Sequence, residues 1–130
     1  MIQPEFLIHN LQTLINTQES IKSVSYYIRL NSQNYLIILE IFKIEFSKSN
    51  AYHKLNLLYL LNEIIKSEKC LDPSSEKLVN EFKQILPSLF LDACKSGKVL
   101  ENTHVVEKLR ELQNFWTKKK LIKENSINLL

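Results

Sequence analysis

The fold is decided by the stretch from Leu57 to Ile65, which reads Leu-Leu-Tyr-Leu-Leu-Asn-Glu-Ile-Ile. On a helix this segment is apolar nearly all round, and such a helix is stable where other helices surround it. It is also far shorter than the roughly 20 apolar residues that span a bilayer. We therefore expect a central helix over residues 51–68, with the other helices of the chain packed around it.

The composition describes one ordinary globular domain. The chain has 130 residues, of which 24% are charged and 45% hydrophobic, and its formal net charge is only +3. That charge is too small to indicate a general nucleic-acid binder. The single glycine, Gly97, also excludes the glycine-rich phosphate loops, because neither GxxxxGKS/T nor GxGxxG can be written with one glycine.

The side chains that catalyse reactions or bind metals are few and scattered. Cys70 and Cys94 form no CxxC pair, and no histidine stands at ligand spacing from them. His9, His53 and His104 are far apart, and none lies beside a serine or cysteine in a nucleophile motif. We predict reduced thiols, no metal, no cofactor and no enzymatic activity.

Breaks in the apolar pattern divide the chain into seven expected helices. From Glu5 to Asp72 there is neither proline nor glycine, and short polar segments separate the apolar runs. Thr17 should cap the second helix, and Pro87 should kink or restart a helix because proline has no N–H to donate. The expected helices cover residues 4–15, 19–31, 34–48, 51–68, 73–86, 87–95 and 103–122.

These helices predict an all-α fold, a right-handed α-α superhelix of seven to eight helices built from antiparallel pairs. From Val105 to Trp116 the apolar residues recur at helical spacing, which predicts the buried face of the last helix. The predicted domain covers residues 1–123. We expect residues 124–130 to form a tail or the start of a longer extension.

One face of the central helix carries polar side chains. Tyr59, Asn62 and Lys66 stand at i, i+3 and i+7 and therefore share a face. In one interpretation Tyr59 belongs to the core and Asn62 bonds a neighbouring backbone carbonyl. In the other, this face is the floor of a groove in which a polar amide and a phenol meet an extended peptide.

The end of the chain is basic. Residues 107–124 contain six bases and three acids, and Lys118-Lys119-Lys120 is the densest part. One interpretation is a solvated helix end that interacts favourably with the helix dipole. The other is a site for phosphate groups on a peptide, an RNA or a lipid head group.

Three segments resemble one known family, in the same order and over about residues 3–122. Residues 52–66 read Tyr-His-Lys-Leu-Asn-Leu-Leu-Tyr-Leu-Leu-Asn-Glu-Ile-Ile-Lys, residues 17–25 read Thr-Gln-Glu-Ser-Ile-Lys-Ser-Val-Ser, and residues 112–122 read Leu-Gln-Asn-Phe-Trp-Thr-Lys-Lys-Lys-Leu-Ile. They resemble the CTD-interacting domain (CID or RPR domain). Asn62-Glu63 is similar to the termination-factor and "regulation of nuclear pre-mRNA domain" branch.

The resemblance implies an eight-helix module that binds the heptad-repeat tail of RNA polymerase II, including its phosphorylated form, in a groove between its second, fourth and seventh helices. It implies a nuclear protein that links transcription to pre-mRNA 3′-end processing or termination, with RNA or processing factors as further partners and no membrane. The peptide contacts that it implies are Thr17, Gln18, Ser20, Ile21, Tyr59, Asn62, Lys66 and Phe115.

The chain departs from the family at one position. Members of the branch that read a phosphate use an arginine five residues before the tryptophan, and here that residue is Glu111. Arg110 precedes it and is rotated about 100° around the helix. The candidate phosphate contacts are therefore Lys108, Arg110 and Lys118.

The main alternative is a membrane-trafficking adaptor, since VHS and ENTH domains share the superhelical architecture. Such an adaptor would bind sorting peptides or anionic lipids through its basic end. The signature over residues 54–66 counts against it, and residues 1–15 contain no lysine or arginine for a basic amphipathic helix. RNA binding through the last helix is a third interpretation.

Overall fold

The computed structural model describes residues 2–66, 73–95 and 103–122, and within these ranges it contains helices and no strand. The elements are α1 (Pro4–Gln12), α2 (Gln18–Leu30), the 3₁₀ turn η1 (Ser32–Asn34), α3 (Tyr35–Lys48), α4 (Ala51–Lys66), α5 (Pro73–Cys94) and α6 (Thr103–Lys118). The predicted all-α fold is confirmed. No helix in the described ranges is both long enough and apolar enough to cross a membrane.

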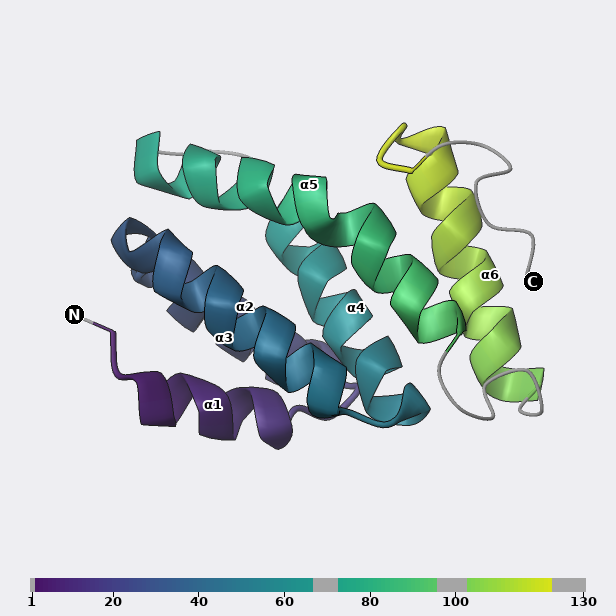
Figure 1. Cartoon of the computed structure of the whole chain (residues 1–130), viewed down its shortest axis with the longest axis horizontal. Helices are drawn as coiled ribbons and strands as arrows, with labels where there is room; N and C mark the ends of the chain where they lie inside the picture. Colours follow the sequence, from purple (N-terminus) through teal and green to yellow (C-terminus); the bar gives the residue numbers. More distant parts are fainter. Residues whose placement is uncertain (1, 67–72, 96–102, 123–130) are drawn as a thin grey trace.

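Helix α4 is the centre of the molecule, as the sequence predicts. It packs against α2, α3, α5 and α6, and Figure 1 shows it between the α2–α3 pair and the α5–α6 pair. Five of its apolar side chains have no accessible surface; they are Leu57, Leu58, Leu60, Leu61 and Ile64. Burial of each such side chain contributes about 1.5–3 kcal/mol, so this one helix anchors much of the core.

The expected helix starts are stabilised by side-chain caps. The Thr17 hydroxyl accepts a hydrogen bond from the Ser20 backbone N–H at 3.1 Å, which confirms the predicted cap of α2. In the same way, the Asn50 side-chain Oδ1 accepts from the His53 backbone N–H at 2.9 Å at the start of α4. These caps fix where α2 and α4 begin.

Lys54 ties the first half of α4 to α5. Its side chain is buried, and its Nζ lies 3.2 Å from Asp92 Oδ2 and 5.6 Å from the centre of the Phe46 ring. A buried ammonium group is stable only where it has partners, and these two contacts supply them.

The prediction of two helices separated at Pro87 is wrong, because α5 continues through the proline. Proline inside a helix costs about 3 kcal/mol. Leu86, Leu89 and Phe90 are buried on either side of it, and their burial offsets that cost. In Figure 1 α5 changes direction part-way along, and its second half approaches α6. This merger also leaves six α-helices in the described ranges, below the predicted seven to eight.

Two other helix ends differ from the prediction. Helix α1 ends at Gln12 rather than at residue 15, and α6 ends at Lys118 rather than at residue 122. After α6 the chain reverses at Lys120, whose φ is 60°. There the Leu121 N–H bonds the Trp116 carbonyl at 2.9 Å and the Lys120 N–H bonds the Thr117 carbonyl at 3.0 Å, which is a Schellman motif.

Several sequence-based predictions lie outside the described residues. They are the last two residues of the expected helix 51–68, the reduced thiol of Cys70 and the tail 124–130. Cys94 is described and is a free, buried thiol, as predicted, and burial raises its pKa to about 12. It is therefore protonated near neutral pH and a poor nucleophile.

Candidate functional site

One hydrogen bond joins the central helix to the last helix. Trp116 on α6 is fully buried, and its ring meets the edge of Phe90 with 5.6 Å between ring centres. Its indole Nε1–H donates to Asn62 Oδ1 on α4 at 2.9 Å. In the described residues Asn62 makes no hydrogen bond to a backbone carbonyl; its side-chain oxygen accepts from the buried indole instead.

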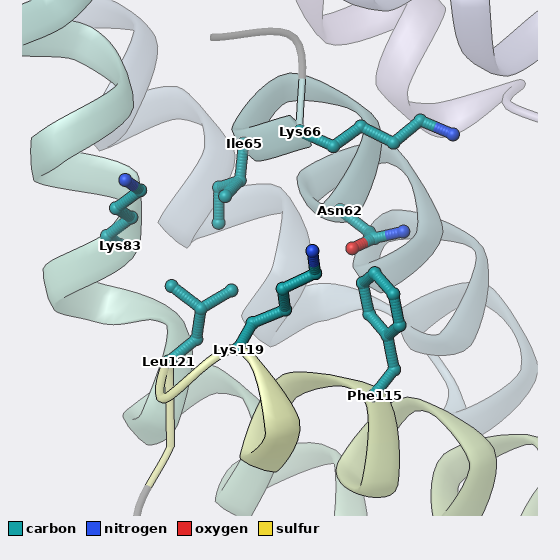
Figure 2. A pocket seen from close by; sticks show the side chains of 7 residues that line it. All are labelled: Asn62, Ile65, Lys66, Lys83, Phe115, Lys119 and Leu121. Carbon is teal, nitrogen blue, oxygen red and sulfur yellow. The ribbon is translucent and has the colours of Figure 1, made fainter.

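This bond also fixes the orientation of the Asn62 amide. An indole N–H can only donate, so the oxygen of the amide must face Trp116 and the NH₂ group must face away. In Figure 2 the nitrogen of Asn62 lies on the side away from Lys119. Among the described residues the bond to Trp116 is the one hydrogen bond of this side chain. The amide thus offers two N–H donors to a ligand.

Beside Asn62 lies a cleft of about 230 Å³ between α4, α5 and α6. Apolar side chains line it together with one lysine each from α4, from α5 and from the turn after α6 (Figure 2). The residues that line it are Asn62, Ile65, Lys66, Lys83, Phe115, Lys119 and Leu121. The structure therefore brings together Asn62, Lys66 and Phe115 of the predicted contacts.

Of the other four lining residues, Lys119 belongs to the basic run 118–120 that the sequence offered as a phosphate site, whereas Ile65, Lys83 and Leu121 were not predicted. Lys119 follows Phe115 by four residues and so shares its face of α6, which is a signal that the sequence did contain. Lys83 carries no such signal, because its place beside α4 depends on how α5 packs.

Tyr59 lies at the other end of the site, near Glu111. The pKa of its phenol is raised above the ordinary value of 10.0 by two causes. Burial is the larger one, and the negative charge of Glu111 is the smaller. The phenol is therefore neutral at physiological pH and can donate a hydrogen bond as well as accept one.

The candidate phosphate contacts are placed less favourably for that role. The Glu111 carboxylate lies 3.5 Å from Lys108 Nζ, so these two charges offset each other on the surface of α6. Arg110 and Lys118 are exposed. None of these three bases lines the cleft in the described part of the chain.

The predicted contacts at the start of α2 have structural roles of their own. Besides the cap made by Thr17, the Ser20 hydroxyl accepts from the Ile15 N–H at 3.3 Å. Ile21 is buried in the core, whereas Gln18 is exposed. A role in peptide binding for these four residues stays a prediction.

The chemistry of the described residues is that of a binding surface. Within them no three His, Cys, Asp or Glu side chains gather in a group that could hold a metal ion. The site offers a fixed amide, a neutral phenol, apolar side chains and lysines.

Comparison with known families agrees with this reading. The family model described as CID domain matches residues 5–130. The chain belongs to the CID domain family. No curated protein matches the sequence. CID domains are helical superhelical protein-interaction domains, and the family is known for binding the C-terminal tail of RNA polymerase II. Membership of the termination-factor branch stays a prediction.

In this CID domain, we predict that Asn62→Leu lowers the free energy of unfolding by about 1–3 kcal/mol, because it leaves the buried indole N–H of Trp116 without an acceptor. Asn62→Asp keeps an oxygen at that place and should lose clearly less. Urea denaturation of the two variants measures the difference. Equal losses, or an Asn62→Leu variant as stable as the parent, would contradict the structural role of the bond.

We also predict that Glu111→Gln lowers the pKa of Tyr59, because a neutral residue no longer disfavours the tyrosinate. That pKa should stay above 10.0, since burial is the larger cause of the shift. The Tyr59 ring signals in an NMR pH titration report it directly. Glu107→Gln, one turn earlier on α6, is the control, and an unchanged Tyr59 pKa in Glu111→Gln would refute the contact.

Proposed function

We propose that this CID domain is a nuclear, non-catalytic module that binds the heptad-repeat tail of RNA polymerase II. It would thereby link transcription to pre-mRNA 3′-end processing or termination. The observation that carries the proposal is the Asn62 side chain, whose oxygen accepts from Trp116 at 2.9 Å while its NH₂ group has no partner among the described residues.

The chemistry of these groups suits a tyrosine-containing, proline-rich peptide. An amide donor and a neutral phenol can bond a tyrosine hydroxyl and the adjacent backbone carbonyls. A proline-rich peptide is already extended, so it loses little entropy on binding. Because the tail repeats its heptad, weak binding by one domain gains from avidity.

Glu111 limits how far the family pattern applies to this chain. A carboxylate at the position of the family's arginine repels a phosphate, and it already pairs with Lys108. We therefore expect the groove to accept an unphosphorylated heptad, with no phosphate read at the position of Glu111.

The test is fluorescence anisotropy with an unphosphorylated two-heptad peptide. Tyr59→Phe removes a hydroxyl that has no partner among the described residues, so the fold should be unaffected. Affinity should fall about three- to tenfold, the value of one hydrogen bond. Tyr26→Phe, at an exposed position on α2, is the matched control and should bind like the parent.

Two outcomes would contradict the proposal. One is no binding of the peptide even at millimolar concentration. The other is an equal loss in Tyr59→Phe and Tyr26→Phe. If vesicles of anionic lipid bind instead, the VHS/ENTH-like adaptor becomes the better interpretation, and that binding should weaken steeply with salt.

A further inference from the structure

Helix α3 has the same kind of sequence as the central helix, but one of its sides is uncovered. Residues 35–46 are mostly apolar, and a helix that is apolar nearly all round is stable where other helices surround it. Yet Ile37 and Ile44 each expose 44% of their surface, and Leu36 exposes 68%. Apolar side chains gathered on an exposed face mark an interaction surface. We propose that two copies of this chain associate through this face of α3.

The exposed face of α3 lies on the side of the molecule opposite Tyr59. Helix α3 packs between α1 and α5, whereas α2, α4 and α6 form a second row of helices. Toward that row α3 presents Phe46, whose ring centre lies 5.6 Å from the Lys54 ammonium group of α4. Ile44 precedes Phe46 by two residues and leaves α3 about 160° from it, and Tyr59 follows Lys54 by five residues and leaves α4 about 140° from it. A second copy bound at Ile44 therefore leaves Tyr59 accessible.

The apolar residues of this face form a stripe that is symmetric along the helix. Ile37, Ile41 and Ile44 stand at i, i+4 and i+7 and therefore share a face. Ile41, in the middle, also packs partly against the core. When two such helices run antiparallel, Ile37 of one copy meets Ile44 of the other, and the two Ile41 side chains meet at the axis. This is the self-complementary contact of a two-fold dimer, in which both copies use the same surface.

The charges beside the stripe fit the same arrangement. Leu36, Glu40 and Lys43 form the neighbouring row of α3, again at i, i+4 and i+7. Glu40 and Lys43 are exposed, and neither makes an ion pair within the ranges that the structure describes. The two residues lie on either side of Ile41, so the antiparallel pairing places Glu40 of each copy opposite Lys43 of the other. Complementary charges of this kind fix the register of an interface.

The contact is small, so the association should be weak. One helix face buries less than the roughly 800 Å² per partner of a standard interface, and we expect a dissociation constant on the order of 100 µM. Two domains on one repeated peptide reach such concentrations because the peptide joins their sites. A dimer would then bring two binding sites to one heptad-repeat tail. This consequence rests on the proposed function, whereas the dimer itself does not.

Sedimentation velocity of the unliganded chain, from about 10 µM to about 1 mM, tests the inference. The parent should pass from monomer to dimer across this range. Ile44→Glu places a charge at the centre of the contact and should weaken association about tenfold or more. Tyr26→Glu makes the matched change at an exposed aromatic residue of α2 and should associate like the parent.

Two charge reversals test the antiparallel pairing. Glu40→Lys and Lys43→Glu should each weaken association about three- to tenfold, because like charges then face each other across the contact. The double variant exchanges the two charges, so opposite charges meet again and the dissociation constant of the parent should return. Both residues are exposed, and far-UV circular dichroism should show an unchanged fold in all three variants.

Three results would overturn the inference. They are a parent chain that stays monomeric at about 1 mM, a dimer that Ile44→Glu leaves intact, and a double variant that associates no better than the single reversals. Peptide binding by the Ile44→Glu variant is measured separately. It should equal that of the parent for one two-heptad peptide, and its absence in both proteins would contradict the proposed function without affecting the dimer.

Discussion

The hydrogen bond between Trp116 and Asn62 is the constraint on which the site depends. A fully buried indole N–H must have an acceptor, because an unpaired buried donor costs about 1–3 kcal/mol. Asn62 supplies that acceptor across the contact between α4 and α6. The same bond that completes the core also turns the NH₂ group of Asn62 toward the side on which the proposed peptide would bind.

The rest of the fold serves to bring these two residues together. Helix α4 is buried on several sides, and the continuous, bent α5 carries Phe90 to the ring of Trp116. Along the contact between α4 and α6 the partners advance in the same direction. Tyr59 lies near Glu111, Asn62 bonds Trp116, and the lysine-lined cleft follows. The contact thus passes from a Glu111–Lys108 ion pair at one end to three lysines at the other.

Much of the fold could be predicted because its signals are local. The apolar stretch from Leu57 to Ile65 required a surrounded helix, and Thr17 marked the start of α2 by cap chemistry alone. The predicted break at Pro87 was wrong because the helix-breaking tendency of proline is local, whereas the burial of its neighbours depends on the tertiary fold. In this structure burial outweighs that tendency, and α5 continues through the proline. Neither the partner of Asn62 nor the place of Lys83 could be predicted, because each depends on packing between helices distant in sequence.

Trp116 is the single tryptophan of the chain, so its indole N–H gives one NMR signal that reports directly on the bond to Asn62. The decisive measurement is the hydrogen exchange of this signal, followed by its chemical shift during titration with an unphosphorylated two-heptad peptide. The account predicts exchange much slower than in the unfolded chain and a shift that saturates as peptide binds beside Asn62. Exchange as fast as in the unfolded chain, or a signal that does not move while peptide binds, would contradict it.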